Sequence, residues 1–185
     1  ILKHLQSCYA TNVGIEFKYI SDQKRIDWLT TEMERNFTKQ MPIEKKRRIL
    51  EKLNQGVMFE KFLHTKYVGQ KRFSLEGGEC TIPALDAIIT PAVEDDVHEV
   101  VIGMAHRGRL NVLANIIGKP IHQVIAEFDE AANSSSNAYG SGDVKYHLGS
   151  SGKRTTSQGH TIDMSVAFNP SHLEAVDPVV QGIVR

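Results

Sequence analysis

The chain has 185 residues, and its 22 Lys and Arg residues balance its 22 Asp and Glu residues, so its formal net charge at pH 7 is zero. A chain of this kind has no global field to hold a polyanion or an anionic membrane, which argues against nucleic acid and membrane as main partners. Hydrophobic residues make up 41% and charged residues 24% of the sequence. This composition is typical of a globular domain and excludes wholesale disorder.

Three further features of the sequence limit the class of protein: its apolar stretches, its first residues and its cysteines. The longest apolar stretches, such as residues 100–105, are far shorter than the roughly 20 residues needed to cross a bilayer. The chain begins at Ile1 without an initiator Met or a signal region, so we expect it to start inside a longer protein or after processing. Cys8 and Cys80 are distant in sequence, which indicates a reducing compartment rather than a disulfide framework.

The first third of the chain predicts helices. Asp22 can cap a helix in which Ile26, Leu29, Met33 and Phe37 recur at spacings of three and four.

A second helix is expected to begin at Pro42 and to end at Gly56, with a further helix over residues 58–63. The basic run at 45–48 is flanked by glutamates, so we favour an exposed helix face over an anion patch or a nuclear signal.

After Gly69 the pattern changes. Residues 73–79 predict a loop, and residues 82–89 predict a helix that Pro91 closes. Residues 99–104 form a short apolar run with β-branched residues, which is typical of a strand buried on both faces.

Helices and loops follow this strand. Apolar spacing predicts a helix over 110–117 that ends at Gly118, and another that starts at Pro120. Residues 131–142 and 149–159 are rich in Gly, Ser, Thr or Asn and predict loops.

Residues 162–168 alternate as in a strand, and a last helix is expected to start at His172. The sequence thus predicts an α/β protein, with a helical segment over 1–69 before an incomplete α/β domain over 70–185.

The strongest candidate for chemistry is the string His106-Arg107-Gly108-Arg109, between a strand and a helix. Ligands of open α/β sheets lie beyond the carboxyl ends of the strands, and two guanidiniums there suit phosphate or carboxylate. His106 adds a group that exchanges protons near neutral pH. The alternative, a capped helix whose arginines pair with nearby acids, is equally compatible with the spacing.

Two further histidines occupy polar junctions. His147 lies between two predicted loops, and His172 lies at another strand-to-helix junction. No His or Cys pair has the close spacing of a zinc site, so we expect no metal cage of protein ligands.

Four long strings resemble, in order, blocks of the decarboxylating first component of the 2-oxoglutarate dehydrogenase complex. The resemblance runs from about Trp28 to Arg185, yet that enzyme is several times longer, so we expect this chain to be one piece of such an enzyme. The strings are residues 73–79, 103–113, 142–149 and 168–174.

The resemblance implies a thiamine diphosphate-binding fold, a parallel sheet flanked by helices, with thiamine diphosphate and Mg²⁺ as cofactors. It implies oxidative decarboxylation of 2-oxoglutarate in the tricarboxylic acid cycle, with succinyl transfer to the lipoyl domain of dihydrolipoyl succinyltransferase. It also implies a homodimer, in the cytoplasm of a bacterium or in the mitochondrial matrix of a eukaryote. The protein's part in such chemistry is to orient and electrostatically support the cofactor.

By the same resemblance, Arg107 matches an arginine that binds thiamine diphosphate, and His106 and His147 match histidines that recognise and help to process the oxo acid. Weaker candidates for lining the same cleft are Ser151, Ser171 and His172.

The magnesium site is expected outside this chain. Gly142-Asp143, with Asn169 following 26 residues after Asp143, mimics the Gly-Asp…Asn magnesium pattern of thiamine diphosphate enzymes. Asp143 follows a Ser- and Gly-rich loop rather than a buried strand, so we do not assign it. The metal ligands are expected beyond Arg185, with the ring-activating glutamate further on, so the chain alone should be inactive.

Two other functions remain open from the sequence. One is 2-oxoadipate dehydrogenase, a member of the same family that shares these strings. The other is a non-catalytic module, in which the helical first third serves dimerisation or docking of the succinyltransferase.

Overall fold

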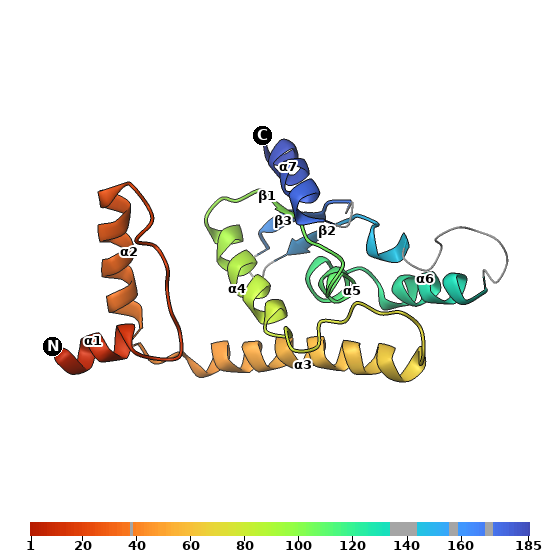
Figure 1. The fold of residues 1–185 in the computed structure, drawn as a ribbon, viewed down its shortest axis with the longest axis horizontal. Helices are drawn as coiled ribbons and strands as arrows, with labels where there is room; N and C mark the ends of the chain where they lie inside the picture. The colour runs from red at the N-terminus through yellow and green to blue at the C-terminus, as the bar shows by residue number, and fades with distance from the viewer. Residues whose placement is uncertain (38, 134–143, 156–158, 169–171) are drawn as a thin grey trace. The chain divides into compact units, whose positions relative to one another are not determined.

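A computed structural model describes residues 1–37, 39–133, 144–155, 159–168 and 172–185 (Figure 1). The chain divides into two compact units, residues 1–46 and residues 47–185. None of the described helices is both long and apolar enough to span a bilayer.

The first unit contains the helices α1 (Leu2–Tyr9) and α2 (Gln23–Asn36). The predicted cap is confirmed, because the side chain of Asp22 accepts hydrogen bonds from the backbone N–H groups of Lys24 and Arg25. Cys8 is buried between the two helices, where its thiol lies 3.8 Å from the carbonyl oxygen of Glu34.

Helix α3 (Ile43–Lys66) runs without a break through Gly56, so the prediction of two helices separated at that glycine was wrong. A Cβ at Gly56 would lie 3.2 Å from Cγ1 of Ile82, and the carbonyl oxygen of Gly56 accepts a hydrogen bond from Asn111. The glycine therefore allows another helix to approach closely. The later turns of α3 bury Phe59 and Leu63 in the core of the second unit.

Helix α4 (Thr81–Glu94) contains Pro91 rather than ending there, which corrects a second prediction. The proline removes one N–H donor from the helix. Ile89 and Val93 lie on either side of it and are both buried, so packing stabilises the last turn in spite of the lost hydrogen bond.

The sheet has three strands, β1 (Glu99–Ile102), β2 (Ser150–Thr155) and β3 (Thr161–Val166), in the order β1-β3-β2. The α/β class is confirmed. β1 pairs with β3 in parallel, whereas β2 pairs with β3 antiparallel, so the described sheet is mixed. β2 lies where the sequence predicted a loop. Val100 to Ile102 are only half-buried, so the expected burial of β1 on both faces was wrong in the described sheet.

The predicted helix after β1 is confirmed as α5 (Arg109–Val112), which continues as a π-helical turn, η1 (Leu113–Ile117), and ends at Gly118. α6 (Ile121–Asn133) follows, and a short 3₁₀ turn, η2 (Val144–Tyr146), precedes β2. The last helix, α7 (Leu173–Val184), begins after His172 as predicted.

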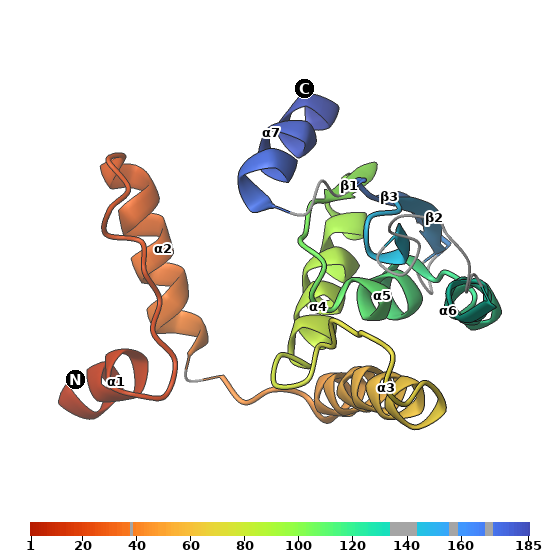
Figure 2. The same ribbon diagram turned by 45° about the vertical axis from the view of Figure 1, so that its right-hand side comes forward.

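The core of the second unit lies between the sheet and the helices α3, α4, α5–η1 and α6, which Figure 2 shows on the same side of the three strands. The buried apolar side chains come from all of these elements, and they include Leu63, Ile82, Ile89, Leu113, Ile117, Phe128, Ile162, Met164 and Val166.

Candidate functional site

The described parts of the three polar junctions predicted from the sequence begin or end at one edge of the sheet. In the parallel pair, Ile102 lies opposite Val166, so β1 and β3 end together. In the antiparallel pair, Ser150 also lies opposite Val166, so β2 begins at that edge. The segments that carry His106, His147 and His172 follow β1, precede β2 and follow β3. We call the end of the sheet where β1 and β3 finish and β2 begins the sheet edge.

Arg109 joins the three segments. Its side chain is fully buried, and it donates hydrogen bonds to the carbonyl oxygens of Met104 after β1, Leu148 before β2 and Ala167 after β3. The bonds to Met104 and Leu148 measure 3.2 Å from Nη1 and 2.8 Å from Nη2. We call these four residues the Arg109 cluster. Because one rigid guanidinium carries all of these donors, the cluster fixes how the three junctions meet.

This arrangement corrects both sequence interpretations of Arg109. Among the described residues, its guanidinium pairs with no acid, and its hydrogen bonds go to backbone carbonyls inside the protein rather than leaving it to face an anion site. Burial, which removes the hydration of the charged form, lowers the pKa of Arg109 to about 10. The guanidinium stays protonated at neutral pH.

Arg107, two residues earlier, lies at the surface. Its Nη1 donates a hydrogen bond to the carbonyl oxygen of Ser74 at 3.1 Å. A carbonyl carries no net charge, so this contact orients the guanidinium without neutralising it. Arg107 therefore presents the exposed cation of the His106–Arg109 string, which suits an anionic ligand.

Aromatic rings link His106 to the segment that carries His147. The ring centroids of His106 and Phe73 lie 4.1 Å apart, and those of Phe73 and Tyr146 lie 5.0 Å apart with their planes at 86°. The backbone N–H of Phe73 donates to the hydroxyl oxygen of Tyr146 at 3.2 Å. Phe73 thus links the half-buried His106 to the buried Tyr146, which directly precedes the half-buried His147 in the chain.

The weaker candidates fall in different places. Ser151 is an exposed residue of β2, next to the strand's start, and lies opposite Ser165 of β3. His172 is exposed and is the N-cap residue of α7, without a capping hydrogen bond from its side chain. Ser171 lies outside the described residues, as do Asp143 and Asn169 of the rejected magnesium pattern.

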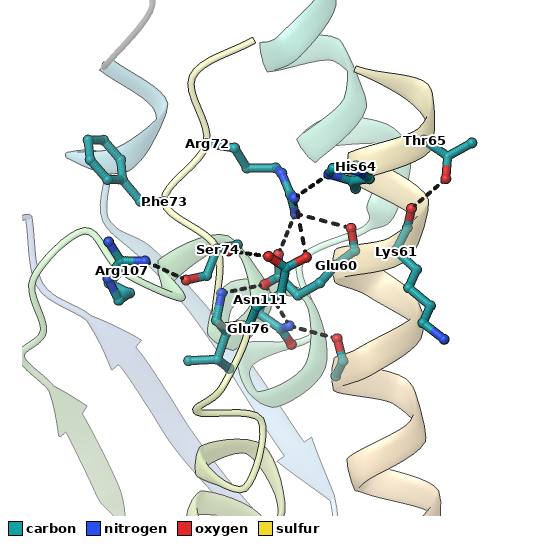
Figure 3. A network of polar contacts seen from close by, with 12 residues as sticks. Glu60, Lys61, His64, Thr65, Arg72, Phe73, Ser74, Glu76, Arg107 and Asn111 are labelled. Carbon is teal, nitrogen blue, oxygen red and sulfur yellow. Dashed lines mark hydrogen bonds and ion pairs between the residues drawn. The ribbon is translucent and has the colours of Figure 1, made fainter. Parts of the chain in front are cut away.

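The sequence interpretation missed a buried polar network beside this site (Figure 3). Glu60 of α3 and Asn111 of α5 are almost completely buried and are hydrogen-bonded to each other at 3.0 Å. Glu60 directly follows Phe59, and Asn111 lies between Leu110 and Val112, so a polar residue beside buried apolar ones was the available signal. Within the described part of the chain, no group of three or more His, Cys, Asp or Glu side chains could hold a metal ion.

Comparison with known proteins agrees with the resemblance. The chain is 52% identical to the multifunctional 2-oxoglutarate metabolism enzyme of Mycolicibacterium vanbaalenii and 50% identical to the 2-oxoglutarate dehydrogenase E1/E2 component of Corynebacterium glutamicum. It is 45% identical to the mitochondrial 2-oxoglutarate dehydrogenase of Dictyostelium discoideum.

Each of these alignments covers the whole chain but only 15% of the two bacterial relatives and 18% of the Dictyostelium protein. Residues 51–184 match the family described as Dehydrogenase E1 component. The chain therefore belongs to the dehydrogenase E1 component family.

Proposed function

We propose that the chain is part of the first component of a 2-oxoglutarate dehydrogenase, which decarboxylates 2-oxoglutarate and passes the succinyl group to the lipoyl domain of dihydrolipoyl succinyltransferase. The names of the relatives support this substrate. The observation that carries the proposal is the Arg109 cluster, because it gathers an exposed cation and three histidine-bearing segments at the carboxyl ends of two parallel strands.

The residues at the sheet edge fit thiamine diphosphate. A diphosphate needs cationic donors, and Arg107 offers an exposed guanidinium whose protein contact is a neutral carbonyl. When bound, this cofactor supplies a carbon nucleophile for the keto carbon of the oxo acid and takes up the electrons left by CO₂. Mg²⁺ would accompany the diphosphate, with ligands from outside this chain.

Each residue then has a separate task. Arg107 binds an oxygen of the diphosphate by a charge-assisted hydrogen bond. His106 and His147 donate hydrogen bonds to the oxo acid and hold or move protons, as imidazoles do near neutral pH. Ser151, Ser171 and His172 are proposed as the weaker candidates for the lining of the same cleft.

The remaining parts of the proposal concern the whole protein. We place residues 1–69 in a helical segment and residues 70–185 in the first part of the cofactor-binding domain. The full-length protein forms a homodimer and associates with the succinyltransferase. It works in the cytoplasm of a bacterium or in the mitochondrial matrix of a eukaryote.

The test replaces His106 or His147 by Ala in the full-length protein and measures CO₂ release from 2-oxoglutarate. We expect each change to lower the rate by about 10²–10⁴-fold, because positioned acid–base groups contribute this much. His122→Ala is the matched control, since His122 is an exposed residue of α6 outside the site. Rates unchanged by both site variants would refute the catalytic assignment. Faster turnover of 2-oxoadipate than of 2-oxoglutarate would refute the proposed substrate.

A further inference from the structure

Glu60 is a buried carboxylate that the proposed chemistry does not use. It is 3% exposed, on the side of α3 that faces the core. Its Oε1 accepts hydrogen bonds from the backbone N–H of Leu75 at 3.1 Å and from Nδ2 of Asn111 at 3.0 Å. Its Oε2 accepts a hydrogen bond from Nη1 of Arg72 at 2.8 Å. Three elements, α3, α5 and the loop after Gly69, therefore meet at one carboxylate (Figure 3).

The loop that Glu60 holds is the one that contacts the candidate site. Three of its consecutive residues contribute backbone groups. The carbonyl oxygen of Phe73 accepts from the N–H of Gly108 at 3.0 Å, that of Ser74 accepts from Arg107 at 3.1 Å, and the N–H of Leu75 donates to Glu60. The Ser74 carbonyl that orients Arg107 and the Leu75 N–H that Glu60 fixes therefore belong to the same planar peptide group.

The space around this contact is tight. Gly108 has φ +74°, and a Cβ there would lie 2.4 Å from Cδ1 of Leu75. Leu75 is 8% exposed and so lies buried against the turn that carries Arg107. The loop therefore cannot slide toward that turn, and its position depends on the hydrogen bonds that hold Leu75 in place.

We propose that Glu60 is a positioning residue for Arg107: by fixing Leu75 and Asn111 together, it sets the Ser74 carbonyl that aims the guanidinium at the diphosphate. This inference rests on the proposed function, because it takes Arg107 as a ligand of thiamine diphosphate. Glu60 itself touches no ligand in this scheme.

The contacts of Glu60 explain why its position requires a carboxylate. Two oxygens accept three donors, so the group must offer acceptors on both sides. Glutamine keeps the size and one acceptor, but it would turn an NH₂ group toward Leu75 and Asn111 or toward the Arg72 guanidinium, where a donor already points. Glu60→Gln therefore loosens the loop with little change in volume.

The experiment is a double-mutant cycle on the full-length protein. The affinity for thiamine diphosphate in the presence of Mg²⁺ is measured by isothermal titration calorimetry for the wild type, Glu60→Gln, Arg107→Ala and the double variant. We expect Glu60→Gln to weaken binding by about tenfold, by analogy with metal sites, where the outer hydrogen-bond partners of ligating residues contribute about 10–100-fold. In the Arg107→Ala background the same change should have no further effect.

The matched control is Asp86→Asn. Asp86 is a second buried carboxylate of the same unit and pairs with Arg48 and Arg154, away from the loop at Phe73–Leu75. A role of Glu60 in stability alone predicts that both variants lower the melting temperature and leave the cofactor affinity unchanged. If Glu60→Gln does not fold, Glu60→Asp takes its place, because aspartate keeps the charge but draws the oxygens back from the Leu75 N–H.

The outcomes separate the inference from the proposed function. Weakened binding in Glu60→Gln that disappears in the Arg107→Ala background supports the inference. Additive losses in the double variant, or unchanged affinity in Glu60→Gln when Arg107→Ala weakens binding, would overturn it while the proposed function stands. No effect of Arg107→Ala on thiamine diphosphate binding would overturn the assignment of Arg107 and the inference with it.

Discussion

The Arg109 cluster and the contact around Asp86 each bury an arginine against the sheet, but the two regions satisfy it with different acceptors. At the sheet edge, the acceptors of Arg109 are backbone carbonyls from three segments. Toward the other end of β2, Arg154 donates to the carboxylate of Asp86 at 2.6 Å, and Arg48 of α3 donates to the same carboxylate at 2.6 Å.

The difference shows in the pKa values. Burial lowers the pKa of Arg109, since neutral carbonyls only partly replace its lost hydration. Burial works to raise the pKa of Asp86, but the hydrogen bonds and charges of Arg48 and Arg154 outweigh it and hold that pKa below its usual value. The sheet edge is therefore held by hydrogen-bond geometry, and the Asp86 contact is held by charge. Each region predicts a different response to mutation and pH.

The largest effect on stability is expected at the sheet edge. Arg109→Met keeps an unbranched apolar chain but leaves the carbonyls of Met104, Leu148 and Ala167 without their donor. We expect the local free energy of opening to fall by about 3 kcal/mol, because each buried carbonyl that loses its partner costs about 1–3 kcal/mol and removal of the desolvated charge offsets part of the loss. Native-state hydrogen exchange of the β1 and β3 amides in the full-length protein measures this change.

Arg109→Lys refines the same test. An ammonium on a flexible stem cannot reproduce the planar fork, so lysine should recover less than half of the loss. A loss below about 0.5 kcal/mol in Arg109→Met, the range of ordinary surface changes, would contradict the view that the cluster holds the three segments together.

Much of the fold followed from periodicity and capping, but β2 did not. The apolar spacing of α2 with its cap at Asp22 and the alternation in β3 predicted both elements. β3 buries alternate residues, and α2 buries Met33 and partly buries Ile26 and Leu29 on the predicted face. The sequence of β2, Ser-Ser-Gly-Lys-Arg-Thr, has no such pattern. It becomes a strand because β3 offers it a partner and because Arg154 reaches Asp86, which are tertiary contacts.

Only part of the candidate site could be predicted, because its assembly also depends on tertiary contacts. The three polar junctions could be recognised one by one, but their meeting depends on the pairing order β1-β3-β2, which no local pattern contains. The sequence also could not separate Arg107 from Arg109. The positions of the Leu148 and Ala167 carbonyls decide which arginine is buried, and those residues lie 39 and 58 positions from Arg109.

A smaller effect is expected at the Asp86 contact. Asp86→Asn keeps the shape of the side chain but removes the charge that both arginines share, and Arg48 can turn to water because its side chain is 48% exposed. We expect a loss of about 2 kcal/mol, below the roughly 3–5 kcal/mol for a fully buried ion pair, because Arg48 keeps access to water. Urea midpoints of the full-length protein, followed by circular dichroism, measure the change.

The pH dependence of this loss distinguishes charge from shape. The pKa of Asp86 is lowered in the folded protein from an ordinary value of 3.8, so the stabilisation is fully present above that value and disappears as pH falls through the folded pKa. The gap between the wild type and Asp86→Asn should therefore be constant from about pH 7 to pH 5 and shrink below about pH 4. A gap that stays constant down to pH 3 would mean that the contact is held by geometry after all.

The smallest effect on stability is expected for Arg107→Ala, and it sharpens the contrast with Arg109. The two arginines are two residues apart, yet Arg107 is exposed and bonds one carbonyl at the surface, whereas Arg109 bonds three inside. We expect Arg107→Ala to change the local opening free energy by less than about 0.5 kcal/mol in the same hydrogen-exchange experiment. A loss as large as that in Arg109→Met would make Arg107 a structural residue, and the anionic ligand would then need another cation at the sheet edge.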